Sequence, residues 1–268
     1  MSGPEPTYRF LDARVLRTQR LSRSLLRVVL GGPGLGAVVS GGRDQRLKLF
    51  LPHDGQDAPV LPDVLDADWY PRWRALDPAV RGVMRTYTVR DVRRDPDELD
   101  IDFALHGDLG PASRWAAAAA SGDRLTVLAP VVHDNGGVDF RPPDGTDWVL
   151  LCADETAVPA VAGILEWLPA GTAVRAWISV GDPADRIALP TKGEAEVSWL
   201  TRPASVPEAV AAADLPAGRP YAWLAGEAAL VRDVRRHLVG PRAFPRPDVT
   251  FTGYWRRGAT EDALLDGA

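Results

Sequence analysis

The first half of the chain alternates apolar and polar residues with a period of two, which is typical of β-strands that bury one face. Leu25-Leu26-Arg27-Val28-Val29-Leu30 has this character and breaks at Gly31-Gly32-Pro33-Gly34. The pattern predicts six strands: two within residues 9–30, and others at 47–51, 85–92, 99–105 and 123–129. Short strands separated by Gly, Pro and Asp clusters predict a small antiparallel barrel.

The pattern changes after a dense cluster of turn residues at 134–145. We place a domain boundary there, which gives a barrel domain at 1–143 and a second domain at 144–268. The second domain alternates apolar strands with helices, at 148–153, 157–168, 173–180, around 197, 207–213, 221–225, 230–238 and 249–252. Continuous apolar strands between helices predict a parallel α/β sheet that is buried on both faces.

Ligands of an open parallel sheet bind at the carboxyl ends of its strands. In this chain the rule selects Asp154-Glu155-Thr156-Ala157 after the first strand and Gly226-Glu227 after a later one. Both segments also open helices, so each of them is equally explained as a helix cap.

Two segments of the first domain carry residue types that suit a bound flavin nucleotide. Arg85-Thr86-Tyr87-Thr88-Val89-Arg90 offers a planar ring, a forked cation and small hydroxyls on one strand. Gly110-Pro111-Ala112-Ser113 precedes a run of alanines, and the exposed N–H groups of the helix start predicted there suit a phosphate. The alternatives are an ordinary strand with solvated arginines, and plain N-capping of the helix by Ser113.

Two further stretches have competing interpretations. Residues 32–37 match G-x-G-x-x-[GA], but the residues that follow cannot open a helix, so we interpret the match as a turn and not as a dinucleotide fingerprint. Residues 52–80 predict a long loop with one helical turn, in which Trp69, Tyr70 and Trp73 line a ligand cleft or, the interpretation we favour, cap the barrel.

Composition narrows the class of protein. The net charge is −5, which gives no general attraction to nucleic acid, although Lys48 and Lys192 are the only lysines among 31 basic residues. A single cysteine, no secretory leader and no apolar run of membrane-spanning length predict a cytoplasmic protein. The sequence contains no G-x-S-x-G, HExxH, Walker A or paired CxxC motif, and its four histidines lack ligand spacing, so we expect no bound metal.

Six segments, taken in order, resemble the siderophore-interacting protein family, the ferric-siderophore reductases of the ferredoxin-reductase-like flavoproteins. They are Leu47-Lys48-Leu49, RTYTVR at 85–90, HGDLGPASRWA at 106–116, ADETAVPA at 153–160, WLAGE at 223–227 and GYWRRG at 253–258. The resemblance spans nearly the whole chain. It implies a six-stranded antiparallel Greek-key FAD-binding barrel followed by a parallel-sheet NAD(P)-binding α/β domain.

The resemblance also implies the residues of the site. Tyr87 would lie against the isoalloxazine with Thr88 near N5, Ala112 and Ser113 would bind the pyrophosphate, and Asp154 would line the nicotinamide site. The full set of implied cofactor contacts is Arg85, Thr86, Tyr87, Thr88, Asp102, His106, Leu109, Ala112, Ser113, Asp154, Thr156, Ala157, Gly226, Glu227, Tyr254 and Trp255. Lys48, Arg256 and Arg257 would bind the substrate, and no side chain would act as an acid or a base.

The implied activity is hydride transfer from NADH or NADPH to FAD, followed by single-electron reduction of ferric siderophores. We expect a monomer that binds no nucleic acid and does not insert into a membrane. One departure from the family is Val131-Val132-His133-Asp134, where members often carry a further basic residue; it concerns the choice of siderophore and not the flavin. The alternatives are a flavin-dependent reductase or redox partner with a non-iron acceptor, and a siderophore- or flavin-binding protein without turnover.

Overall fold

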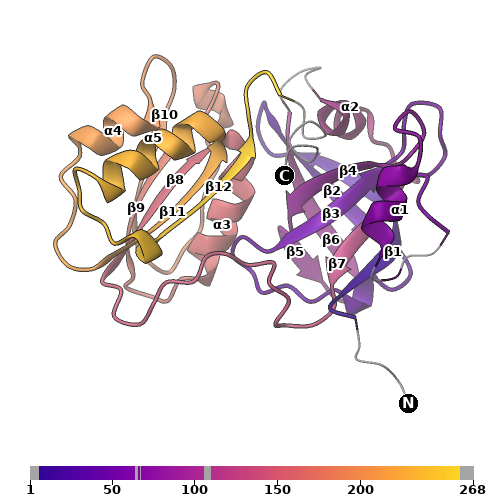
Figure 1. The fold of residues 1–268 in the computed structure, drawn as a ribbon, viewed down its shortest axis with the longest axis horizontal. Helices are drawn as coiled ribbons and strands as arrows, with labels where there is room; N and C mark the ends of the chain where they lie inside the picture. The colour runs from indigo at the N-terminus through magenta and orange to yellow at the C-terminus, as the bar shows by residue number, and fades with distance from the viewer. Residues whose placement is uncertain (1–5, 64–65, 67, 106–109, 260–268) are drawn as a thin grey trace. The chain divides into compact units, whose positions relative to one another are not determined.

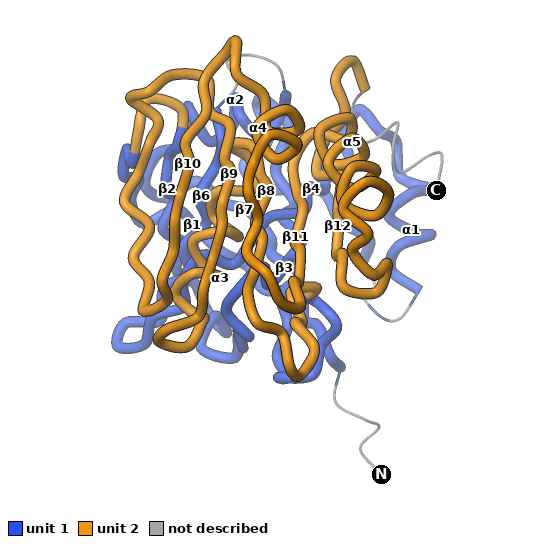
Figure 2. The backbone as a smooth tube through the Cα atoms, turned by 90° about the vertical axis from the view of Figure 1, so that its left-hand side faces the viewer, with its two compact units in different colours: residues 1–21, 25–138 blue, residues 22–24, 139–268 orange. Residues whose placement is uncertain are grey.

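The computed structural model describes residues 6–63, 66, 68–105 and 110–259. The chain forms two compact units, which Figure 2 shows in different colours. Unit 1 comprises residues 1–21 and 25–138, and unit 2 comprises residues 22–24 and 139–268.

Unit 1 is a seven-stranded antiparallel sheet in the order β4-β3-β7-β1-β2-β6-β5, with β4 and β6 also in contact. Its strands are β1 (Tyr8–Arg20), β2 (Leu25–Gly31), β3 (Arg46–Leu51), β4 (Val83–Thr88), β5 (Asp91–Arg93), β6 (Glu98–Ala104) and β7 (Arg124–Pro130). Its helices are η1 (Leu35–Ala37), α1 (Trp69–Ala75) and α2 (Pro111–Ala118). The predicted antiparallel barrel is confirmed, and the match at 32–37 is a turn with Gly34 in the left-handed region (φ 85°).

The predicted number of six strands is wrong by one, because the expected strand 85–92 is two strands. β4 pairs with β3 and ends at Thr88, whereas β5 begins at Asp91 and pairs with β6. Between them, the Val89 N–H donates to Gln45 O (2.8 Å) and the Arg90 N–H donates to Asp100 O (3.0 Å). The segment thus changes its pairing partner within two residues, which the period-two pattern does not reveal.

The barrel core follows the predicted alternation. On β3, Leu47, Leu49 and Leu51 are at most 2% exposed. They belong to one apolar cluster that includes residues of β1, β2, β3, β6 and β7, Val89 just after β4, and Ala112 and Ala116 of α2. Burying an aliphatic side chain of this size contributes about 1.5–3 kcal/mol before entropy is counted. The apolar period therefore sets the inward face of the sheet.

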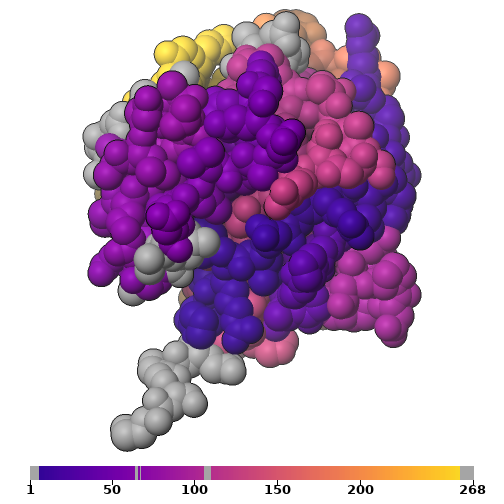
Figure 3. Space-filling view, turned by 90° about the vertical axis from the view of Figure 1, so that its right-hand side faces the viewer, coloured from indigo at the N-terminus to yellow at the C-terminus, as the bar shows by residue number. Residues whose placement is uncertain are grey.

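The aromatic residues of α1 cap the barrel, as favoured from the sequence. Trp69 lies 5.2 Å from Phe10 of β1 and 5.7 Å from Phe50 of β3, measured between ring centroids. Trp73 is 1% exposed, and its indole N–H donates to Gly82 O (3.0 Å). These ring contacts join α1 to β1 and β3, and in Figure 3 the segment belongs to the violet part of the surface.

Unit 2 is a five-stranded parallel sheet in the order β10-β9-β8-β11-β12. Its strands are β8 (Trp148–Asp154), β9 (Ala173–Ser179), β10 (Glu194–Leu200), β11 (Pro220–Glu227) and β12 (Val249–Trp255). Its helices are η2 (Glu155–Ala157), α3 (Val158–Trp167), η3 (Pro183–Asp185), α4 (Val206–Ala212), α5 (Ala228–Val239) and η4 (Arg246–Asp248). Figure 1 shows α4 and α5 in front of the sheet and α3 behind it.

The predicted α/β sheet is confirmed, with one correction at its end. The last strand continues past Thr252 to Trp255, because Gly253 pairs with Gly226 and, after a shift in register, Trp255 pairs with Glu227. Cys152 is fully buried in β8, and burial raises the pKa of its thiol far above the ordinary value. Among the described residues no helix has both the length and the apolar character that a bilayer crossing needs.

A chain of ion pairs crosses the strands of unit 1. Glu98 accepts hydrogen bonds from Arg17 (2.6 and 2.7 Å) and from Arg93 (2.7 Å), and Arg93 also pairs with Asp100 (2.6 Å). These hydrogen bonds, that of Arg17 first, lower the pKa of Glu98 from 4.5 to about 2. The carboxylate therefore stabilises the barrel only while it is ionised.

Because the pKa of Glu98 is depressed in the folded chain, its contribution to stability is complete above pH 4.5 and is lost as the pH falls toward 2. We expect Glu98→Gln to lower the denaturation midpoint at pH 7 and to flatten its decline between pH 5 and 2. Urea unfolding at a series of pH values measures both effects. Asp97→Asn is the control, because Asp97 is an exposed neighbour; an equal change in both variants would contradict the assignment.

Candidate functional site

Tyr87 of β4 is held at the edge of the barrel core by other rings. Its centroid lies 4.4 Å from that of Phe103 on β6, and Phe103 lies 5.9 Å from Trp115 on α2. Tyr87 is half-buried and packs against the main apolar cluster of unit 1. The series of rings brings the predicted flavin strand and the predicted phosphate helix into one neighbourhood of unit 1.

The neighbours of Tyr87 on β4 differ in exposure. Arg85 is 7% exposed and its Nη1 donates to Met84 O (2.7 Å), and Thr88 is 6% exposed. Thr86 is exposed and lies across from Lys48 of β3, whose Nζ donates to Thr86 Oγ1 (2.7 Å). The strand therefore presents a desolvated guanidinium, which binds anions more strongly than a solvated one does.

The start of α2 is uncapped by any described side chain. The helix begins at Pro111 after an extended Gly110, so Ser113 is its third residue and the predicted N-cap role of Ser113 is wrong. Its hydroxyl instead donates to Ala104 O (3.1 Å). The N–H groups of the first turn suit an anionic group, which is a fit to the pyrophosphate of FAD.

Of three other predicted cofactor contacts in unit 1, the structure describes only Asp102. Asp102 on β6 is 4% exposed, and its two carboxylate oxygens accept from Arg27 Nε (2.7 Å) and Nη2 (2.9 Å). Its place in the structure is thus within the ion-pair network of the barrel. His106 and Leu109 lie outside the described residues.

Asp154 joins the carboxyl ends of three strands in unit 2. Its Oδ1 accepts from the N–H (2.9 Å) and the hydroxyl of Thr156, and its Oδ2 accepts from the Glu227 N–H (2.7 Å) and the Trp255 indole N–H (2.8 Å). An ionised carboxylate has about four acceptor positions, and these four donors occupy all of them. Asp154 therefore holds β8, β11 and β12 in place, and its neighbours present the surface that a ligand would meet.

The two predicted ligand loops also act as helix caps. Asp154 caps η2, and Glu227 caps α5 by accepting from the N–H groups of Ala229 (2.7 Å) and Leu230 (3.2 Å). The other oxygen of Glu227 accepts from the Arg257 N–H (3.4 Å), which ties the segment after β12 to the same loop. The capping interpretation of both loops is therefore confirmed, and Asp154 and Glu227 also connect the loops to β12 and the segment after it.

The remaining predicted residues lie on these loops or at the end of β12. Ala157 is fully buried in η2, Tyr254 and Trp255 are half-buried, and Arg256 and Arg257 are exposed. Sequence reasoning missed Phe103 as the ring partner of Tyr87. It also missed the Asp154–Trp255 bond, because no pattern links residues 101 positions apart.

The two units together define the class of protein. A solved ferredoxin reductase of carbazole 1,9a-dioxygenase shares this fold, with a TM-score of 0.64 at 18% identity, over 94% of this chain and 71% of that chain. Residues 14–134 match the siderophore-interacting FAD-binding domain, and residues 146–258 match the siderophore-interacting protein domain. The chain belongs to the siderophore-interacting protein family.

Individual relatives agree with this membership. The chain is 31% identical to the ferric vibriobactin reductase ViuB of Vibrio cholerae, over 95% of this chain and 92% of that protein. It is 32% identical to the NADPH-dependent ferric-chelate reductase of Escherichia coli, over 92% and 93%. A solved siderophore utilization protein from T. fusca superposes with a TM-score of 0.81 at 33% identity, over 95% of each chain.

Gly226 offers a test of the Asp154 arrangement. Its φ is 132°, and a Cβ at this position would lie 2.6 Å from the Asp154 carboxylate carbon. We expect Gly226→Ala to lower the free energy of unfolding by about 3 kcal/mol, since it adds a steric clash to backbone strain.

The matched control is Gly171→Ala, because Gly171 also has a positive φ (78°) but a Cβ there meets nothing within 4 Å. It should cost only about 1 kcal/mol. Denaturant unfolding monitored by tryptophan fluorescence measures both variants, and equal losses would show that the carboxylate does not confine position 226.

Proposed function

We propose that this chain is a FAD-dependent NAD(P)H oxidoreductase that reduces ferric siderophores, with the ferric complex as its substrate. The observation that carries the proposal is in unit 1, where Tyr87 and the uncapped start of α2 are linked through Phe103 and Trp115. The names of the Vibrio cholerae and Escherichia coli relatives support the ferric substrate.

FAD, when bound, supplies hydride acceptance from NADH or NADPH and donation of single electrons to the acceptor. The protein provides the position for this chemistry. Tyr87 offers a ring face that is already braced by Phe103, so little side-chain entropy is lost when a flat ligand stacks on it. Arg85 and the N–H groups of Ala112 and Ser113 bind the phosphates, and Thr86 and Thr88 offer hydroxyls on the same strand.

In unit 2 the loops joined by Asp154 receive the dinucleotide. Asp154 is a positioning residue: it holds the indole of Trp255 and the backbone of Glu227 through two bonds to one oxygen. Thr156, Ala157 and Gly226 complete the loop surface, and Tyr254 adjoins it on β12. Asp154 is only 3% exposed, and Gly226 leaves no room for a Cβ beside its carboxylate.

Positive charge on the two units attracts the substrate. Lys48 and the exposed pair Arg256 and Arg257 bind an anionic ferric chelate, because chelating oxygens give such complexes negative charge. Reduction to ferrous iron then weakens the oxygen chelate, since ferric iron is the harder ion.

We propose further that the protein works in the cytoplasm as a monomer and binds no nucleic acid.

The direct test uses the purified protein. We expect a yellow spectrum. NADH or NADPH should bleach it under anaerobic conditions, and a ferric catecholate or hydroxamate should restore it.

We expect Tyr87→Ala to weaken FAD binding at least tenfold, which corresponds to about 1.4 kcal/mol of lost contact. Tyr70→Ala is the control, because it alters the aromatic cap of the barrel and should retain the flavin. The reductase proposal would be contradicted by equal turnover with non-iron acceptors or by a flavin that NADH and NADPH cannot bleach.

Lys48 tests the docking of the substrate. Lys48→Ala should raise the KM for an anionic ferric siderophore about tenfold and leave anaerobic flavin reduction unchanged, because the ammonium attracts the chelate and does not contact the dinucleotide. Lys192→Ala is a matched control, as Lys192 is the other lysine and is exposed in unit 2. Unchanged siderophore kinetics in Lys48→Ala would remove this residue from the docking site.

A further inference from the structure

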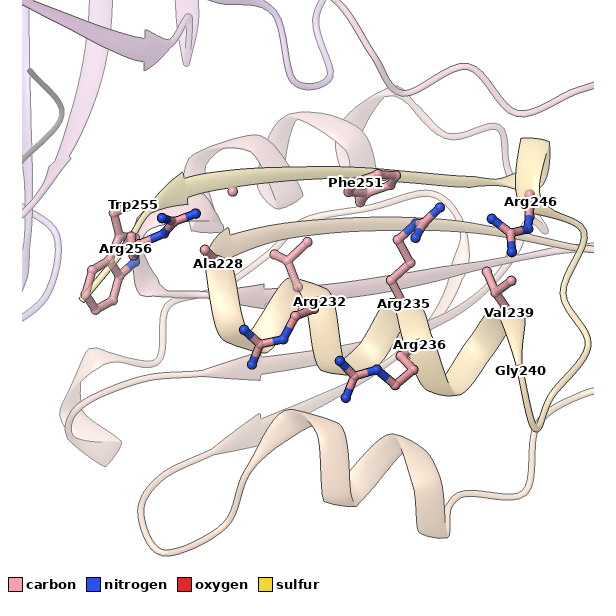
Figure 4. A pocket seen from close by; sticks show the side chains of 12 residues that line it. Ala228, Arg232, Arg235, Arg236, Val239, Gly240, Arg246, Phe251, Trp255 and Arg256 are labelled. Atoms are coloured by element: carbon pink, nitrogen blue, oxygen red, sulfur yellow. The ribbon is translucent and has the colours of Figure 1, made fainter. Parts of the chain in front are cut away.

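A groove runs along unit 2 between α5 and β12, the strand at the edge of the sheet. Its volume is about 800 Å³. One wall is a face of α5, and the other is formed by alternate residues of β12, namely Phe251, Gly253 and Trp255 (Figure 4). This size lies within the range of about 300–1,000 Å³ that is usual for small-molecule pockets.

Arginine dominates the lining of the groove. Five of its described residues are arginines, and none of the described lining residues is Asp or Glu. The five come from three segments: Arg232, Arg235 and Arg236 from α5, Arg246 from η4, and Arg256 from the chain after β12. In a chain with a net charge of −5, this surface concentrates positive potential where a small anion would enter.

The positive charges of α5 are only partly balanced within the protein. Asp233 pairs with Arg232 (3.0 Å) and lies 3.7 Å from Arg236. Glu227 also interacts with Arg232. Like charges within one turn of a helix repel each other, and these two carboxylates offset only part of the repulsion among the arginines. Binding of anionic groups in the groove would reduce this repulsion and is therefore electrostatically favourable.

Arg235 has no ion pair with any described residue and is held by an aromatic ring. Its guanidinium carbon lies 4.3 Å above the ring centroid of Phe251, and its Nε is buried with no hydrogen-bond partner among the described residues. In Figure 4 the side chains of Arg235 and Arg246 extend toward each other across the groove. Two forked cations at one end of the groove suit bidentate binding of phosphate or carboxylate oxygens.

The floor of the groove is apolar. Val231, Val239 and Phe251 contribute to it, and Phe251 is 48% exposed, which is unusual for a large aromatic residue. A ligand with a flat or apolar part would cover this floor while its charged groups meet the arginines.

We propose that the α5–β12 groove binds a small organic polyanion, a molecule with two or more phosphate or carboxylate groups and an apolar part. The groove begins beside the loops around Asp154, where Trp255 and Arg256 also belong to the proposed reductase site, and extends from there along α5. Its main anion contacts are Arg235 and Arg246, with Arg232 and Arg236 on the rim.

The test is calorimetric titration of the full chain with tripolyphosphate, citrate and orthophosphate at constant ionic strength. We expect tripolyphosphate or citrate to bind at least tenfold more tightly than orthophosphate, and the stronger of the two identifies the phosphate or the carboxylate class. Arg235→Gln/Arg246→Gln should weaken that binding at least tenfold. Arg235→Lys, which keeps the charge without the planar fork, should give an intermediate loss.

Arg141→Gln is the matched control, because Arg141 is an exposed arginine of unit 2 outside the groove. Equal weakening in this control and in the double variant would mean adventitious ion binding and would overturn the proposal. So would unchanged affinity in a double variant whose thermal unfolding matches the parent.

The dinucleotide is itself an anion, so a competition experiment separates the two sites. Saturating NAD⁺ or NADP⁺ should leave tripolyphosphate binding unchanged, and the double variant should keep its KM for the dinucleotide. Displacement of the probe together with a raised KM would assign the groove to the dinucleotide site and overturn the inference. Failure of the reductase proposal is distinct, because it would appear as absent flavin reduction with intact polyanion binding.

Discussion

The carboxylate of Asp154 is the constraint on which the second unit depends. It is 3% exposed and carries a charge that burial would make very unfavourable without partners. Four donors, from Thr156, Glu227 and Trp255, remove that cost and in doing so fix the carboxyl ends of β8, β11 and β12. Because the protein's own donors occupy the carboxylate oxygens, the structural role of Asp154 is to hold these three strand ends together.

In the first unit, aromatic contacts rather than a buried carboxylate connect the separate elements. There, the rings of Tyr87, Phe103 and Trp115 connect β4, β6 and α2 through non-polar contact, and the ionic residues form a separate network around Glu98, Asp100 and Asp102. The charges of this network are thus paired within the barrel wall, and the half-buried ring of Tyr87 and the helix start without a described side-chain cap stand apart from it. Each unit combines a rigid scaffold with a small number of groups that the scaffold leaves available.

Much of the fold followed from the sequence. The period-two segments at 25–30 and 47–51 became β2 and β3, and the apolar runs at 148–153 and 173–180 became β8 and β9. The family could be recognised from short segments because several residues act through local backbone geometry, such as Gly226 at its positive φ. The N-cap role of Ser113 was misjudged, since the helix starts three residues earlier, at Pro111 after Gly110, and the Ser113 hydroxyl donates to Ala104 O instead.

The sequence by itself determined the order and type of the elements, the inward faces of the strands and the membership of the family, because these depend on periodicity and on residues close together in the chain. Only the tertiary structure decided the change of pairing partner at Val89 and Arg90, the hydrogen bond from Trp255 to Asp154, and the presence of Arg235 and Arg246 in one groove. These features join residues from separate elements. Their energies come from packing and from charge in a low-dielectric interior, where position in space counts and separation along the chain does not.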